Sequence, residues 1–244
     1  MEGGSTVRWA RSSALCRDAG FFAGLIGVGA RGQTEPVTTA RTVFLLSPAH
    51  CGGRRAQILM RSRARSPLAH RLRESGASLG EVFEFLSGLY FRGKLAYARA
   101  FAGPADVLVI VPGAGLLPPE TPLTLPELRA IARVGVTADP AFLATFERGV
   151  ERLASGLTAP DRVVLLGSIA SGKYVDSLDG RLGELLHFPA DFVGRGDMSR
   201  GGLMLRAASS GRELDYVPFR GAIRHGKRPP KLEPVPRALQ VRMR

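Results

Sequence analysis

Residues 163–174, VVLLGSIASGKY, place a wholly apolar strand directly before a glycine-rich loop that ends in Gly-Lys. The sequence matches the P-loop motif, which cradles phosphate, at every position except the last, where the motif requires a serine or threonine hydroxyl to hold Mg²⁺. Tyr174 stands at that position. No later apolar strand ends in the aspartate that completes the metal site of a P-loop NTPase. We therefore interpret the loop as a phosphate-binding turn without NTPase machinery. The residues expected to hold the phosphate are Gly167, Ser168, Ser171, Gly172 and Lys173.

Two other apolar strands also run into loops of small residues. TVFLL (42–46) is followed by SPAHCGGRR (47–55), and VLVIV (107–111) is followed by PGAG (112–115). A weaker fourth strand, ELLHF, is expected at 184–188. Helical segments separate these strands, which is typical of α/β proteins. The sequence predicts an α/β fold with three layers, in which helices cover both faces of a mostly parallel, four-stranded sheet.

The helices between the strands carry clear start and stop signals. Ser66-Pro67 opens a helix, with serine as the N-cap and proline at the first helical position. The apolar spacing at 79–102 predicts two helices broken near Ser87-Gly88. Thr124 and Glu127 spell a capping box for a helix that ends near residue 133. Two more helices are expected, from residue 140 to about 156 and over 198–210.

The chain divides by composition into three parts. Residues 42–219 form the expected single α/β domain, and residues 220–244 form a basic, proline-rich tail. Residues 1–41 are expected to be a poorly ordered extension, although a basic flank before the apolar stretch 19–30 also fits a weak secretory signal. The net charge of +13 is concentrated in the tail, where eight basic residues face one acid. The tail is either a solvated arginine-rich segment or a nucleic-acid contact.

The carboxyl ends of parallel strands meet at one edge of a sheet, where α/β folds bind ligands. The loops after the three strands therefore predict an anion site, although glycine, serine and proline also serve turn geometry alone. The binding residues expected outside the loop at 167–173 are Ser47, Arg54, Arg55, Gly113, Gly115, Arg195 and Arg200.

Acid–base chemistry has few candidates. His50 and Cys51 lie in the first loop, and their adjacency on an extended backbone would point them apart. Asp197 precedes the last helix as either a helix cap or a general base. No spacing of histidines, cysteines or carboxylates matches a metal motif, so neither a metal nor a cofactor is expected.

Residues 42–218 resemble a group of uncharacterised bacterial proteins placed near the uracil-DNA glycosylase-like α/β fold. The matching segments are FLLS (44–47), LYFRGKLAYARAFA (89–102), VLVIVPGAGLLPPETPL (107–123) and VVLLGSIASGKYVDSL (163–178). The resemblance implies a three-layer sheet whose loops receive a nucleotide or a flipped base. It implies no particular reaction.

Two functional hypotheses follow. In the first, the chain is a nucleotide- or nucleic-acid-directed enzyme, hydrolytic or glycosylase-like, that acts at the loops after the first three strands. In the second, it is a non-catalytic module that binds nucleic acid or a phosphorylated small molecule. No run of about 18 apolar residues suggests a membrane partner. Two cysteines give no disulfide framework, which favours a cytoplasmic location.

Overall fold

The computed structural model describes residues 40–103, 106–134, 140–169 and 174–233. All of them belong to one compact unit, Ala40–Arg244. No helix in these ranges is long and apolar enough to cross a membrane.

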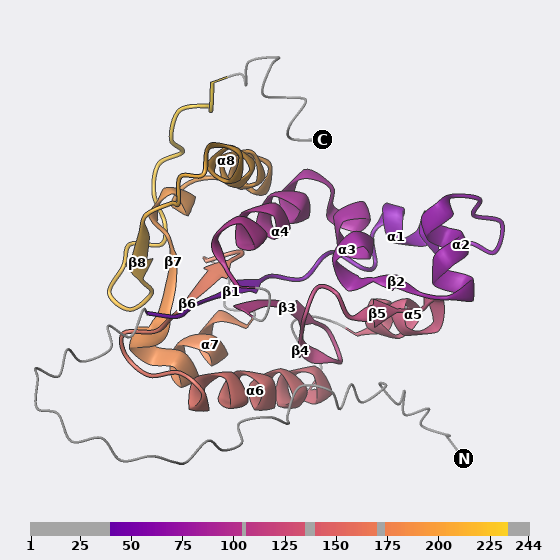
Figure 1. Cartoon of the computed structure of the whole chain (residues 1–244), viewed down its shortest axis with the longest axis horizontal. Helices are drawn as coiled ribbons and strands as arrows, with labels where there is room; N and C mark the ends of the chain where they lie inside the picture. The colour runs from indigo at the N-terminus through magenta and orange to yellow at the C-terminus, as the bar shows by residue number, and fades with distance from the viewer. Residues whose placement is uncertain (1–39, 104–105, 135–139, 170–173, 234–244) are drawn as a thin grey trace, which may run out of the picture. The chain divides into compact units, whose positions relative to one another are not determined.

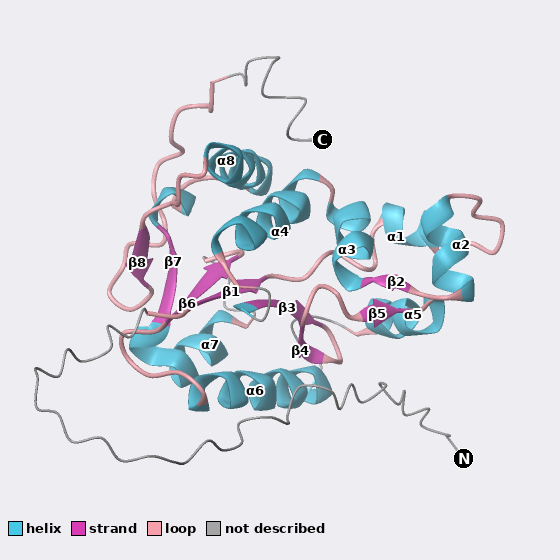
Figure 2. Cartoon of the chain, in the orientation of Figure 1, coloured by secondary structure: helices cyan, strands magenta, loops and turns pink. Residues whose placement is uncertain are grey.

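The centre of the unit is a mixed sheet with the strand order β4-β3-β1-β6-β7-β8 (Figure 2). In that order the strands are β4 (Gly115–Leu117), β3 (Val107–Val111), β1 (Thr42–Leu46), β6 (Arg162–Leu166), β7 (Leu186–Pro189) and β8 (Tyr216–Pro218). The four inner strands are parallel to one another, and β4 and β8 are antiparallel to their neighbours. The prediction of an α/β fold is confirmed, and the four expected strands form the parallel part of the sheet.

The prediction of a four-stranded sheet is wrong, because the two edge strands extend it to six. Both edge strands have only three residues, too few to show an alternating or apolar pattern. Strand β4 forms because Gly113 (φ 78°) and Gly115 (φ 84°) turn the chain back along β3. The fourth parallel strand, β7, begins at Leu186 rather than at residue 184, because a 3₁₀ turn occupies Gly183–Leu185.

Helices cover both faces of the sheet, with α4 and α8 on one face and α6 and α7 on the other (Figure 1). The helices are α1 (Arg54–Leu59), α2 (Pro67–Glu74), α3 (Leu79–Ser87), α4 (Leu89–Phe101), α5 (Leu125–Arg133), α6 (Pro140–Ser155), α7 (Val175–Leu182) and α8 (Asp197–Ser210). A small antiparallel pair, β2 (Ala77–Ser78) and β5 (Pro122–Leu123), lies outside the main sheet.

The local signals for helix ends operate as expected. The Ser66 hydroxyl accepts the Ala69 amide at 3.3 Å, and proline occupies the first turn of α2. Both halves of the Thr124–Glu127 capping box form at the start of α5. Gly88, with a φ of 58°, separates α3 from α4 at the predicted break.

Helices α4 and α8 cross at two glycines. A Cβ atom on Gly93 would lie 2.5 Å from the carbonyl oxygen of Gly201, and one on Gly201 would lie 2.8 Å from the carbonyl oxygen of Leu89. The two backbones are therefore in direct contact, and no larger residue fits at the crossing without a backbone shift. This contact fixes the start of α8 relative to α4.

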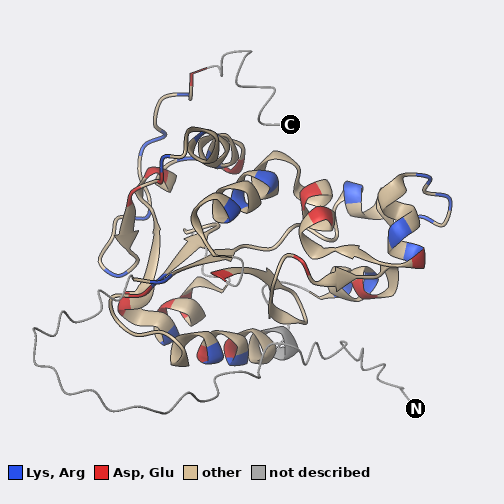
Figure 3. Ribbon diagram, viewed as in Figure 1, with Lys and Arg blue, Asp and Glu red and all other residues tan. Residues whose placement is uncertain are grey.

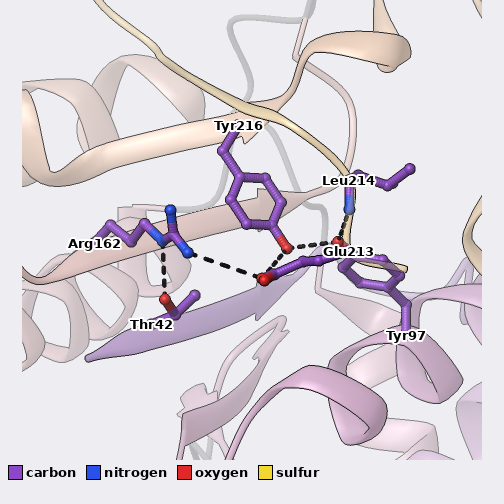
Figure 4. Close-up of polar contacts among 6 residues, drawn as sticks. All are labelled: Thr42, Tyr97, Arg162, Glu213, Leu214 and Tyr216. Atoms are coloured by element: carbon purple, nitrogen blue, oxygen red, sulfur yellow. Dashed lines mark hydrogen bonds and ion pairs between the residues drawn. The ribbon is translucent and has the colours of Figure 1, made fainter. Parts of the chain in front are cut away.

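A polar network ties α4 to three strands at the amino ends of β1 and β6 (Figure 4). The Tyr97 hydroxyl accepts the Leu214 amide at 2.8 Å and lies 2.5 Å from the Tyr216 hydroxyl. Tyr216 donates to Glu213 at 2.7 Å, and Arg162 stacks over its ring at 4.8 Å from the centroid. This edge of the sheet is therefore closed by structural contacts, whereas the opposite edge holds the cavity described next.

Candidate functional site

The strand order creates a crevice at the carboxyl ends of β1 and β6. After β1 the chain moves to β3 on one side, and after β6 it moves to β7 on the other side. The segments that follow these two neighbouring strands thus lead away from each other, which makes this position the topological switch point where doubly wound sheets bind ligands. Ser47, the first residue after β1, extends the ladder by donating its amide to the Leu166 carbonyl at 3.2 Å.

A cavity of about 570 Å³, here called the switch-point pocket, opens at this crevice. Its wall contains five hydroxyl-bearing side chains, together with His50 and Asp197. The hydroxyls belong to Ser47, Ser87, Tyr90, Ser168 and Tyr174. Loops after β1 and β6 and helices α3, α4 and α8 supply these residues, so segments distant in sequence converge on one polar wall.

A buried lysine lies directly behind the pocket wall. Lys94 on α4 is 1% exposed, and its Nζ lies 2.8 Å from both the Oγ and the carbonyl oxygen of Ser47. Burial lowers the pKa of this amine to about 7, against a smaller opposing effect of Asp197. At physiological pH, the charged and neutral forms of Lys94 are therefore present in comparable amounts.

Two buried tyrosines flank Ser47. Burial raises the pKa of Tyr90 to about 12 and also raises that of Tyr174, so both hydroxyls stay protonated. The Tyr174 hydroxyl faces the Ser47 side chain and the backbone of Ser168. The Tyr90 hydroxyl makes no hydrogen bond of normal geometry within the described ranges, although Ser47 and Arg200 lie near enough to lower its pKa against the larger effect of burial. A buried, unpaired hydroxyl is costly, so the Tyr90 donor points to a partner supplied from the pocket.

The structure brings four of the expected site residues together in this pocket: Ser47, His50, Ser168 and Asp197. Gly167 lies behind them, where a Cβ atom would meet Ser47 Cβ at 2.7 Å, so a larger residue there would separate the two strand ends. Ser171, Gly172 and Lys173 lie outside the described residues. Gly196 is the N-cap of α8, so Asp197 is its first helical residue rather than its cap.

The remaining expected site residues lie elsewhere or have structural partners. Gly113 and Gly115 form the β3–β4 turn, where their positive φ angles explain the choice of glycine. Arg54 is exposed at the first residue of α1, and Arg55 donates to the Phe85 carbonyl at 3.2 Å. Arg55 lines a different cavity, of about 740 Å³.

The two arginines around α8 differ in burial and in partners. Arg200 is buried and donates to the Phe192 carbonyl at 2.9 and 3.2 Å and to the Gly167 carbonyl at 3.3 Å. It therefore holds the end of β6 against the loop before α8. Arg195 donates to Ser199 Oγ at 3.3 Å and lines a separate groove along α8.

Cys51 is not placed for nucleophilic chemistry. Its thiol is buried, lies 3.5 Å from the Ala49 carbonyl oxygen, and has its pKa raised by burial to about 12. A thiol in that state forms almost no thiolate near neutral pH. His50, the neighbouring residue, is exposed at the pocket wall.

Four residues of this region were not predicted as site residues from the sequence: Ser87, Tyr90, Lys94 and Tyr174. Lys94 is one of only four lysines among 34 basic residues, and it follows Tyr90 by one helical turn on the apolar face of α4. A lysine among the core-facing residues of a helix indicates a buried polar partner, since lysine is almost never fully buried without one. The sequence of α4 therefore contained a signal for this contact.

Comparisons of the chain with models of protein families, with curated proteins and with solved structures found no match.

Proposed function

We propose that the switch-point pocket binds a phosphorylated ligand of the nucleotide class. The observation that carries this proposal is the convergence of five hydroxyls at the carboxyl ends of β1 and β6. Hydroxyl groups both donate and accept, so such a wall suits phosphate oxygens and the hydroxyls of a sugar. By sequence, Lys173 follows in the loop after β6 and would add a charge-assisted contact to a phosphate.

The same pocket supports a catalytic role for this chain. His50, from the loop after β1, and Asp197, from the start of α8, line one cavity. An imidazole and a carboxylate that face one bound molecule are suited to general acid–base catalysis. Hydrolysis, or glycosylase-like cleavage of the bound ligand, is the reaction class that we propose for them.

Calorimetric titration of the full chain tests the binding proposal. The probes are a nucleoside monophosphate, the matching nucleoside and inorganic phosphate, and we expect the monophosphate to bind most tightly. Ser168→Ala should weaken its binding by about 0.5–1.5 kcal/mol, roughly two- to tenfold. Lys173→Ala should weaken it on the order of tenfold to a hundredfold. Ser155→Ala, an exposed serine at the end of α6, is the matched control. Equal isotherms for Ser168→Ala and the control would refute the proposed site.

A second candidate function, nucleic-acid binding without catalysis, has its own supporting observation. A groove of about 340 Å³ runs beside α8 and is lined by four basic residues and no acidic one. These residues are Arg195, Arg206, Arg228 and Lys231. Figure 3 shows basic residues along the chain that follows β8. A groove with one sign of charge attracts a phosphate backbone regardless of base sequence.

The salt dependence of oligonucleotide binding tests this second candidate. Each neutralised phosphate adds about 0.7–0.9 to the slope of log affinity against log salt. Removing two groove charges with Arg228→Ala and Lys231→Ala should therefore lower the slope by about 1.5. The control removes two charges from α6, with Arg148→Ala and Arg152→Ala, and should leave the slope unchanged. An equal fall in both double variants would eliminate the groove as the binding surface.

A further inference from the structure

Ser47 and Lys94 form a pair that ligand binding alone does not require. Ser47 directly follows the central strand β1, and the Lys94 side chain contacts it from α4, which covers one face of the sheet. The Nζ and Oγ atoms are 2.8 Å apart, within the range at which a base takes a proton from a nucleophile. We propose that Ser47 is a catalytic nucleophile and Lys94 its general base, and that the switch-point pocket cleaves a carboxylic ester through an acyl-serine intermediate. This proposal uses the same pocket but does not require the ligand to carry a phosphate.

The contacts of Lys94 suit a neutral amine. A neutral Nζ can donate one N–H to the Ser47 carbonyl and accept the Ser47 hydroxyl proton in its lone pair, and both atoms lie at 2.8 Å. No carboxylate forms an ion pair with Lys94 within the described part of the chain. Its burial holds the pKa near 7, so a large share of the amine can act as a base at neutral pH.

The titratable and charged groups around this pair come from four segments. Tyr90 lies on α4 itself, Tyr174 precedes α7, Asp197 and Arg200 lie on α8, and His50 follows β1. Asp197 favours the charged amine, but less strongly than burial favours the neutral one. His50 lines the same pocket, so a test must separate its contribution from that of Lys94.

The flanking tyrosines supply donors for the oxygen that becomes negative. The hydroxyls of Tyr90 and Tyr174 remain protonated near neutral pH because burial raises the pKa of each. Donors fixed beside a nucleophile stabilise the oxyanion of a tetrahedral intermediate. The unpaired hydroxyl of Tyr90 would find its partner in that oxyanion.

The proposed cycle balances without any other reactant than water. Ser47 Oγ bonds to the ester carbonyl carbon as its proton moves to Lys94 Nζ. The carbon–oxygen bond to the alcohol then breaks, and the protonated Lys94 returns that proton to the leaving oxygen. Water then attacks the acyl carbon and gives one proton to Lys94. The bond from that carbon to Ser47 Oγ breaks, the carboxylic acid leaves, and Lys94 returns its proton to Ser47 Oγ.

Labelling of the full chain with a fluorophosphonate tests the proposal. Ser47 Oγ would displace fluoride from phosphorus, and mass spectrometry of peptides would locate the adduct on Ser47. The labelling rate should rise about tenfold between pH 6 and pH 8, with a midpoint near 7. Ser47→Ala should abolish the adduct, and Lys94→Met should slow labelling by at least about a hundredfold. The same two variants should lose turnover of p-nitrophenyl acetate.

Controls separate catalysis from a merely structural role of Lys94. Lys94→Arg keeps a donor for the Ser47 carbonyl but cannot act as a base, so it should label as slowly as Lys94→Met. His50→Asn should keep the midpoint near 7, and Ser155→Ala should label at the wild-type rate. If Lys94→Met does not fold, the wild-type pH profile decides. An adduct on another residue, a pH-independent rate, or full labelling of Lys94→Arg would overturn the proposal. Failure of the nucleotide titrations would leave this labelling result unaffected.

Discussion

Replacing Lys94 by methionine should change how the free energy of unfolding depends on pH. The folded-state pKa of Lys94 is about 7, lowered by burial from an ordinary value of 10.5. Between these two values the unfolded chain therefore binds more protons than the folded one, so the stability of the wild type rises with pH. One proton contributes about 1.4 kcal/mol per pH unit when the two states differ fully. Between pH 7 and pH 9 the gain is about 2 kcal/mol, because Lys94 is half titrated at the lower end.

Urea unfolding at pH 7, 8 and 9, followed by far-UV circular dichroism, measures this gain. Methionine matches the length of lysine but does not titrate. The free energy of unfolding of the wild type minus that of Lys94→Met should therefore increase by about 2 kcal/mol from pH 7 to pH 9. The range stops at pH 9 because tyrosines of the unfolded chain begin to lose protons above it. Groups common to both chains cancel in the difference. Parallel stability curves would show that Lys94 is not desolvated in the folded state.

Three further predictions concern stability. Gly93→Ala should lower the free energy of unfolding in urea by about 1–3 kcal/mol, since its Cβ would meet backbone atoms of α8. Gly180→Ala, where the added Cβ has open space in α7, should be neutral or stabilising. Equal effects of the two substitutions would contradict the close crossing of α4 and α8. Arg200→Ala should cost about 3 kcal/mol in the same assay, because it removes three buried hydrogen bonds to the Phe192 and Gly167 carbonyls. A change below about 0.5 kcal/mol would contradict its structural role. Tyr97→Phe should lower the thermal midpoint by about 2–4 °C through the loss of its hydroxyl contacts, and an unchanged midpoint would show that the network in Figure 4 adds nothing.

The sequence predicted the elements whose signals are local. Helix α5 begins where Thr124 and Glu127 form a capping box, because both partners lie within one turn. The four parallel strands were predictable as short apolar runs, since burial on both faces removes polar positions. Edge strands β4 and β8 carry no such signal. Their pairing depends on neighbours already in place, which no three-residue window contains.

The site was predictable only where the topology itself defines it. Ser47, His50 and Ser168 follow strand ends, so the carboxyl-edge rule brings them together. Lys94 could not be placed in the same way, because its partner Ser47 is 47 residues away and the contact arises from the packing of α4 on β1. The charge of Arg200 suggested a ligand, but its donors are directed at backbone carbonyls brought close by the fold.

The central position of β1 has a consequence for the order of assembly during synthesis. Thr42 pairs with Arg162, so one edge of β1 cannot form its hydrogen bonds until a strand that begins 120 residues later has been synthesised. At about 5–20 residues per second the ribosome needs roughly 6–24 s to supply that strand. During this interval β3 can cover one edge of β1, but the other edge of an apolar strand stays unpaired. Nascent chains of intermediate length therefore expose a pairing edge that the finished protein hides, and these are the chains that would need a chaperone.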